Sequence, residues 1–434
     1  MKYISTRGHA PAPGLSAALA AGLAPDGGLY VPQSLPKLAP SAFDGCSDLP
    51  AVAARLLAPF FAGDALATEL EAICRQAFTF PAPLHPLATP RDHVLELFHG
   101  PTAAFKDFGA RFLAACMQRL PRDSGKPLTI VVATSGDTGA AVGAAFANLP
   151  GFKVAILYPD GRVSPRQAHQ LGCFGGNVRA FRVDGAFDDC QRMAKQALSD
   201  GELRAIAPLS SANSISLGRL LPQMAYYADA ALRHLHATGV VLNFVVPTGN
   251  LGNAVACVLA RACGLPIGRI ALATNANRVL PDFFAGADYS AQPSVATIAN
   301  AMDVGAPSNF ERLTWLYPDA AALRREFVSL SVDDETIRAT IRERHARHGE
   351  VLCPHTATAM HLLDTMRANG SAKSIEDWAI VSTAHAAKFD SIVEPLIGMA
   401  VPLPPGLAAL LARPAHADSL ANDYAALREI LAAN

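Results

Sequence analysis

The chain has 434 residues, of which 51% are hydrophobic and 17% are charged. This length and composition allow a core for two or three domains and exclude a largely disordered protein. The formal net charge of -1 provides no overall attraction to nucleic acid or to an anionic membrane, so we expect neither as a partner. A net charge near zero is still compatible with a local basic pocket that binds a small anion.

The cysteines and the apolar stretches indicate the cellular compartment in which the protein is expected. The 8 cysteines are scattered and form no CxxC pair, so the sequence predicts no metal site. They lie in apolar stretches typical of free thiols in a reducing compartment. We recognise no secretory leader and no stretch long and apolar enough to cross a bilayer. We therefore expect a cytoplasmic protein.

Short β-rich runs alternate with helical patterns through the middle of the chain. This alternation predicts an α/β fold with parallel strands and crossover helices, and the uniformly apolar strands are typical of sheets covered on both faces. Strands are expected at 94–98, 128–134, 153–158, 177–183, 240–246, 269–274 and 378–382. Helices are expected at 106–120, from about 138, after Ser164 and Pro165, and at 187–198, 254–263 and 355–366.

The ends of the chain depart from this alternation. The first residues are rich in alanine, leucine and proline, which favours a helical cap, and the β/α rhythm breaks again late in the chain. The expected parts are an N-terminal cap at 1–84, a large α/β domain at 85–120 and 211–400 with an insertion at about 278–350, a small α/β domain at 121–210, and a C-terminal tail at 401–434.

A lysine in an apolar setting is the most informative chemical feature. Lys106 stands in the run HGPTAAFKDFG at 99–109, on a loop that enters a helix. Partial burial among alanines and phenylalanines would disfavour its ammonium form and lower its pKa. A neutral lysine amine is a nucleophile toward carbonyl cofactors such as pyridoxal 5'-phosphate (PLP). The alternative is a lysine that reaches into water from the start of a helix.

Three loops follow apolar strands, at the position where ligands collect in α/β sheets. The run TSGDTGAA at 134–141 offers hydroxyls and helix-start N–H groups to a carboxylate, and PTGNLGN at 247–253 offers glycines and a helix N-terminus to a phosphate. Ordinary helix capping is the alternative for both loops. The run STAH at 382–385 brings a hydroxyl that could meet a ring nitrogen, whereas His385 and Lys388 are expected to be structural or at the surface.

A further hydroxyl-rich run, SSANSISLGR at 210–219, precedes and opens a helix. Arg219 beside asparagine and serine side chains would hold a phosphate dianion. A capped helix with a surface arginine is the alternative.

Taken in order, these runs resemble those of the threonine synthase family, PLP enzymes of the tryptophan-synthase-β fold type. The resemblance covers nearly the whole chain. It implies PLP fold type II, with two parallel-sheet α/β domains and an N-terminal helical cap. It also implies a reaction, the conversion of O-phospho-L-homoserine and water to L-threonine and phosphate, the last step of threonine biosynthesis. Further family-like runs are YISTRG at 3–8, GLAPDGGLYVP at 22–32, AMDV at 301–304, PSNFER at 307–312 and PHTA at 354–357.

The resemblance also implies roles for individual residues. Lys106 would hold PLP and move protons, and Asp137 falls where relatives of this fold type often carry an asparagine near the phenolic oxygen of the cofactor. Thr383, helped by Ser382, would face the pyridine nitrogen. The cofactor phosphate would be bound by Gly249, Asn250, Leu251, Gly252 and Asn253, the substrate carboxylate by Ser135 and Thr138, and the substrate phosphate by Asn213, Ser214 and Arg219.

Two other functions stay open from the sequence alone. One is a threonine-synthase-like phospho-lyase, which shares the same motifs and releases a 2-oxo acid, ammonia and phosphate. The other is a non-catalytic paralogue that binds PLP or an amino acid, against which the intact lysine and loops argue. For the assembly we expect a monomer or a homodimer.

Overall fold

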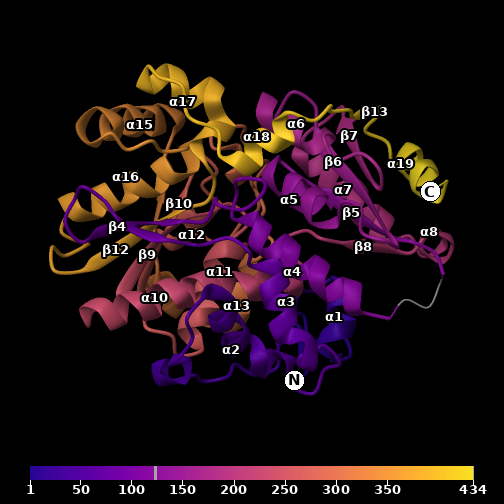
Figure 1. Ribbon diagram of the computed structural model, residues 1–434, viewed down its shortest axis with the longest axis horizontal. Coiled ribbons are helices and arrows are strands. Elements are labelled where there is room, and N and C mark those ends of the chain that lie inside the picture. The colour runs from indigo at the N-terminus through magenta and orange to yellow at the C-terminus, as the bar shows by residue number, and fades with distance from the viewer. Residues whose placement is uncertain (122–124, 434) are drawn as a thin grey trace.

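Two sheets, parallel apart from one edge strand of the larger one, lie side by side in the computed structural model, which describes residues 1–121 and 125–433 (Figure 1). The α/β class predicted from the sequence is confirmed. The larger sheet has the order β11 (Val328–Ser331), β10 (Ile267–Thr274), β9 (Leu242–Pro247), β12 (Asp377–Ser382), β4 (Asp92–Glu96) and β3 (Leu84–Pro86). The smaller sheet has the order β13 (Asp418–Leu420), β7 (Val178–Val183), β6 (Phe152–Pro159), β5 (Leu128–Ala133) and β8 (Leu209–Ser211).

Helices cover both faces of the larger sheet, which explains its continuous apolar strands. Every residue of β9 and β12 is buried, as expected for parallel strands between two helical layers. In Figure 1, α16 (Pro354–Ala368) lies above these strands, and α10 (Met224–Thr238) and α11 (Gly252–Ala262) lie below them.

The smaller sheet is built in the same way. Helices α5 (Asp137–Phe146) and α7 (Phe187–Ser199) pack against β5 and β6. The predicted start of α6 (Pro165–Gly172) is confirmed by a capping box, in which the Ser164 hydroxyl accepts from the backbone N–H of Gln167. Further α-helices later in the chain are α8 (Gly201–Ile206), α9 (Leu217–Leu220), α12 (Val279–Phe284), α13 (Phe310–Leu316), α14 (Ala320–Glu326), α15 (Asp334–His348), α17 (Asp390–Ile397), α18 (Pro405–Leu411) and α19 (Tyr424–Ala432). Within the described residues, no helix has the length and hydropathy needed to span a membrane.

The N-terminal part forms a helical layer below the sheets (Figure 1). It contains α1 (Leu15–Ala21), α2 (Leu49–Phe61) and α3 (Leu70–Ala77), together with a two-stranded antiparallel pair, β1 (Tyr3–Ser5) and β2 (Tyr30–Pro32). This layer packs on α4 (Lys106–Arg119), where the Phe112 ring meets Phe61 edge-on at 6.1 Å and stacks on Phe78 at 5.9 Å. The cap therefore supports the helix whose first residue is Lys106.

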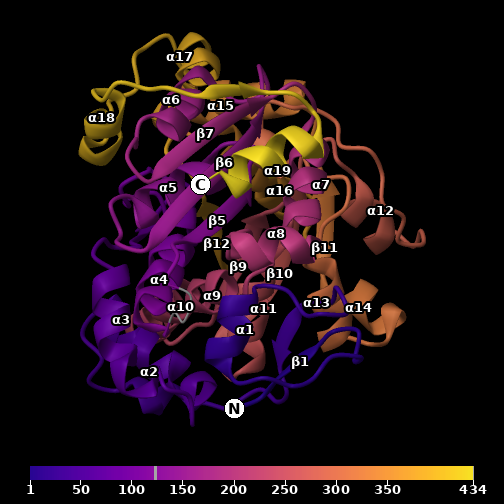
Figure 2. The same ribbon diagram turned by 90° about the vertical axis from the view of Figure 1, so that its right-hand side faces the viewer.

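Four short edge strands of the two sheets are absent from the sequence prediction, and one of them is β8, which pairs with β5. Strand β3 pairs antiparallel with β4, and β11 pairs with β10, so part of the segment 278–350 extends the larger sheet. Strand β13 pairs with β7, so the C-terminal tail returns to the smaller sheet (Figure 2). These strands have three or four residues each, too few for a periodic apolar pattern to mark them.

Helices α4 and α9 approach closely at Gly109. A Cβ atom at this position would lie 2.8 Å from the carbonyl oxygen of Arg219. Because α4 begins with Lys106 and α9 contains Arg219, the missing side chain allows both residues to reach the same space.

Replacement of Gly109 by alanine should lower the free energy of unfolding by about 1–3 kcal/mol, because the added methyl group presses on backbone. Urea unfolding followed by circular dichroism measures this change. Gly201→Ala is the matched control, since a Cβ there meets nothing within 4 Å. Equal unfolding midpoints for Gly109→Ala and the unaltered protein would contradict the close approach.

Candidate active site

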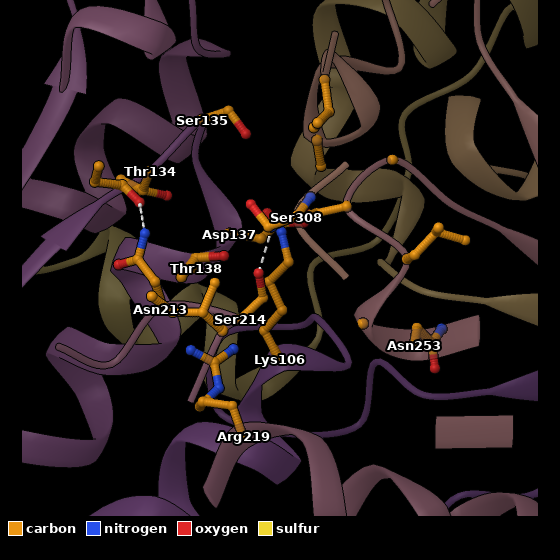
Figure 3. Close-up of a pocket in the computed structure, with 18 of the residues that line it drawn as sticks. Lys106, Thr134, Ser135, Asp137, Thr138, Asn213, Ser214, Arg219, Asn253 and Ser308 are labelled. Carbon is orange, nitrogen blue, oxygen red and sulfur yellow. Dashed lines mark hydrogen bonds between the residues drawn. The ribbon is translucent and has the colours of Figure 1, made fainter. Parts of the chain in front are cut away.

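A cavity opens where the loops after β5, β9 and β12 meet the start of α4 (Figure 3). This is the carboxyl-end position at which α/β sheets bind ligands. All the predicted site residues except Ser382 line it, namely Lys106, Ser135, Asp137, Thr138, Asn213, Ser214, Arg219, Gly249, Asn250, Leu251, Gly252, Asn253 and Thr383.

Backbone hydrogen bonds hold the turn before Lys106 against the loop after β12. The N–H of Phe105 donates to the carbonyl of Thr383 at 2.8 Å, and the N–H of His385 donates to the carbonyl of Ala103 at 3.0 Å. Ala103 has a φ of 55°, a left-handed conformation that costs a residue with a Cβ about 1–2 kcal/mol. The surrounding bonds impose this turn, which places Lys106 at the wall of the cavity.

The environment of Lys106 favours its neutral form. Burial lowers the pKa of its amine to about 8, the cations of Arg219 and Lys388 act in the same direction, and the Asp137 carboxylate opposes them. A lysine with such a pKa is a substantially better nucleophile at neutral pH than a solvated one. The direction agrees with the sequence prediction.

The loop after β9 presents a row of backbone donors. No group of the described chain accepts a hydrogen bond from the N–H groups of residues 249–253, which lead into buried helix α11. Leu251 has a φ of 62°, and a Cβ on Gly249 would lie 2.7 Å from Cα of Met302. Successive free N–H groups at a helix start form a concave anion site.

Two asparagines hold this loop through their side chains. Asn250 donates to the Ser214 hydroxyl at 2.6 Å and accepts from the N–H of Ser308 at 2.5 Å. The Asn253 carbonyl accepts from the hydroxyls of Tyr226 at 2.5 Å and Tyr227 at 2.9 Å. The side-chain carbonyl of Asn253 is therefore engaged in the core, whereas its amide nitrogen is buried without a partner among the described residues.

The loop after β5 is organised by a buried threonine. The Thr134 hydroxyl accepts from the N–H groups of Gly136 at 3.0 Å and Gly139 at 2.9 Å. A Cβ on Gly136 would lie 2.5 Å from the Gln167 amide. Ser135 and Thr138 stay partly exposed on the cavity wall.

Arg219 is a buried cation that forms no ion pair with a carboxylate of the described residues. Its side chain is 2% exposed, one terminal nitrogen donates to the carbonyl of Ala212 at 2.5 Å, and Nε has no acceptor among the described residues. Burial lowers its pKa to about 10, so it stays charged at neutral pH. The nearby Asn213 Oδ1 is also buried and has no hydrogen-bond partner in the described part of the chain. A buried guanidinium of this kind favours a bound anion, and the surface-arginine alternative is wrong.

Three family models match the chain. Residues 83–384 match "Pyridoxal-phosphate dependent enzyme", residues 2–78 match "Threonine synthase N terminus", and residues 356–431 match "Threonine synthase, C-terminal". The threonine synthase of Escherichia coli strain K12 is 40% identical over 436 residues, covering 99% of both chains. The chain belongs to the threonine synthase family. It is a PLP-dependent enzyme with the type II fold of that family.

Solved structures of threonine synthases agree with this assignment. The crystal structure of the Escherichia coli protein matches with a TM-score of 0.92 and 38% identity, covering 99% of each chain. The PLP-bound protein from Brucella melitensis matches with a TM-score of 0.89 and 36% identity, covering 100% of this chain and 99% of that one.

Some residues of this family member lie elsewhere than the sequence suggested. From the sequence, Lys388 is expected to be structural or at the surface; it is fully buried, and its Nζ lies 2.8 Å from Asp137 Oδ1, so the surface alternative is wrong. The Ser382 hydroxyl lies 2.8 Å from that of Thr356 and does not line the cavity. His355, which the sequence placed only in a family-like run, does line it.

His355 is held in one orientation and is neutral. Its Nε2 accepts from the N–H of Ala301 at 3.1 Å, which leaves the proton on Nδ1. Burial lowers the pKa of its imidazole to about 4. It therefore adds no positive charge to the cavity at neutral pH.

In the cofactor-free full-length protein, the rate at which an amine reagent labels Lys106 should rise with pH and reach half of its maximum near pH 8, since burial disfavours the ammonium form. A solvated lysine has a midpoint near 10.4. Competitive labelling across pH, quantified by mass spectrometry of the Lys106 peptide, measures this. A midpoint above about 10 would contradict the described environment.

Proposed function

We propose that this protein is a threonine synthase that converts O-phospho-L-homoserine and water to L-threonine and phosphate. The observation that carries the proposal is the pairing of two anion sites with one lysine amine of lowered pKa in a single cavity. The free N–H groups of residues 249–253 form one site, and buried Arg219 forms the other. A cofactor phosphate and a substrate phosphate require two such sites.

The residues present fit PLP. The row of N–H groups suits its phosphate, Lys106 suits its aldehyde, and the Thr383 hydroxyl on the cavity wall suits its ring nitrogen. When bound, the cofactor supplies an electron sink for the reacting carbons.

The remaining side chains match the substrate. Ser135 and Thr138, beside the start of α5, would bind its carboxylate. Arg219, with Asn213 and Ser214, would bind its phosphate and stabilise the charge that grows on this group as it leaves from Cγ. The Lys106 amine would accept a proton from Cα and one from Cβ, return one to Cγ after phosphate has left, and return one to Cα after water has added its hydroxyl at Cβ.

The cytoplasmic location and the monomer or homodimer stay predictions. All eight cysteines are free thiols, and all but Cys46 are buried, which supports a reducing compartment. The expected partner is the small phosphorylated amino acid alone.

Incubation of the purified protein with O-phospho-L-homoserine should release phosphate and threonine in equal amounts. Lys106→Ala should lose both this turnover and the visible absorbance of the lysine-bound cofactor, because its amine is the attachment point. Lys373→Ala, at an exposed lysine outside the cavity, is the control. Release of a 2-oxo acid and ammonia without threonine would instead indicate a phospho-lyase, and cofactor absorbance without turnover would indicate a non-catalytic paralogue.

Arg219→Met should lower kcat/KM about 100-fold, since a charge-assisted contact to the phosphate is lost. Inhibition by inorganic phosphate, measured at constant ionic strength, should weaken in parallel. Arg342→Met, at an exposed arginine paired with Glu335 outside the cavity, controls for the loss of one positive charge from the protein. Unchanged phosphate inhibition in Arg219→Met would assign the substrate phosphate to another part of the cavity.

A further inference from the structure

We propose that Lys388 is a positioning residue that neutralises the Asp137 carboxylate, so that Lys106 can offer an uncharged amine to the carbonyl cofactor. The inference deepens the proposed function and rests on attachment of the cofactor at Lys106. It assigns a role to the buried ion pair between Lys388 and Asp137. None of the roles proposed above involves Lys388.

The ion pair is completely enclosed and geometrically well defined. Lys388 is 0% exposed and Asp137 is 2% exposed. Lys388 Nζ lies 2.8 Å from Asp137 Oδ1 and donates to the carbonyl of Thr102 at 2.8 Å. The same Asp137 oxygen accepts from the Gln167 amide at 2.9 Å. Two independent donors therefore fix the carboxylate in its ionised form.

Asp137 also acts on Lys106. In Figure 3 the Lys106 side chain extends toward Asp137 at the centre of the cavity. Although burial raises the pKa of Asp137, the cations of Lys388 and then Lys106 hold it well below its usual range. A carboxylate and an ammonium in a low-dielectric site stabilise each other. If Lys106 were the main counter-ion of Asp137, its amine would be held in the protonated form that cannot attack a carbonyl.

Lys388 is the direct counter-ion of Asp137, so Lys106 does not have to be protonated to neutralise this carboxylate. The groups that face Lys106 are Asp137 from α5, Arg219 from α9, Lys388 from the 3-10 helix η5 (Ala386–Phe389) and His355 from α16. His355 is neutral, and Arg219 favours loss of the Lys106 proton as Lys388 does. Asp137 is the one anion in this group, and the cation that lies in direct contact with it is Lys388.

This arrangement predicts a pattern of signs in three variants. In Lys388→Met, Asp137 is left with Lys106 as a partner, so the labelling midpoint of Lys106 should rise by about one pH unit. In Asp137→Asn, the anion is removed and the midpoint should fall. In the double variant Asp137→Asn/Lys388→Met, both charges are removed and the midpoint should return close to that of the unaltered protein. Asparagine keeps the shape of aspartate, and methionine is an unbranched, uncharged side chain one atom shorter than lysine.

The experiment measures Lys106 labelling against pH in the cofactor-free full-length protein, with the rate of PLP uptake by absorbance as a second readout. If the ion pair had only a structural role, the variants would change the stability of the protein, but the labelling midpoint of Lys106 would not rise in one variant, fall in the second and return in the third. Equal midpoints in all folded variants would overturn the inference, as would a double variant that behaves like Lys388→Met. If Lys388→Met does not fold, an unchanged midpoint in Asp137→Asn alone overturns it.

Failure of the inference is distinguishable from failure of the proposed function. If the cofactor attaches to a residue other than Lys106, Lys106→Ala will still acquire the visible absorbance of covalently bound cofactor, and the proposed function fails. If attachment is lost in Lys106→Ala but the midpoints do not move, only the role of Lys388 fails.

Discussion

The contact between the Lys106 turn and the loop after β12 determines the geometry of the whole site. The N–H groups of Phe105 and His385 form its two backbone hydrogen bonds. These bonds join residues 103–105 to residues 383–385, which are far apart in the sequence. The turn needs a left-handed alanine at position 103, which a free loop would rarely adopt. The conformation that presents the lysine is therefore a property of the folded sheet.

A buried carboxylate completes this turn. Asp107 is fully buried and accepts from the N–H of Thr102 at 2.8 Å and from its hydroxyl at 2.7 Å. Burial raises the pKa of Asp107 to about 6, against the effect of these hydrogen bonds. Because Thr102 also accepts from Lys388 through its carbonyl, the turn is linked to the ion pair that faces the lysine. Shape and charge at the site thus depend on the same few residues.

The sequence predicted those features that local chemistry determines. Lys106 and the loops after β5 and β9 were recognisable because glycines, hydroxyls and a helix start occur together in a short run. Lys388 could not be placed in this way, since its partner Thr102 lies 286 residues away. The orientation of Asn253 depends equally on remote contacts, because Tyr226 and Tyr227 come from another helix. Such side chains are fixed only by tertiary packing.

The C-terminal strand β13 covers part of the edge of the smaller sheet, and this affects whether that edge can pair with another molecule. Without β13, the six-residue strand β7 would expose its backbone donors and acceptors along one side. An uncovered strand of that length is a template for pairing with a second molecule, whereas the three-residue β13 offers very little. The last turns of this chain thus protect it from edge-to-edge aggregation, and proteolytic removal of them would threaten solubility before it disturbed the distant chemistry.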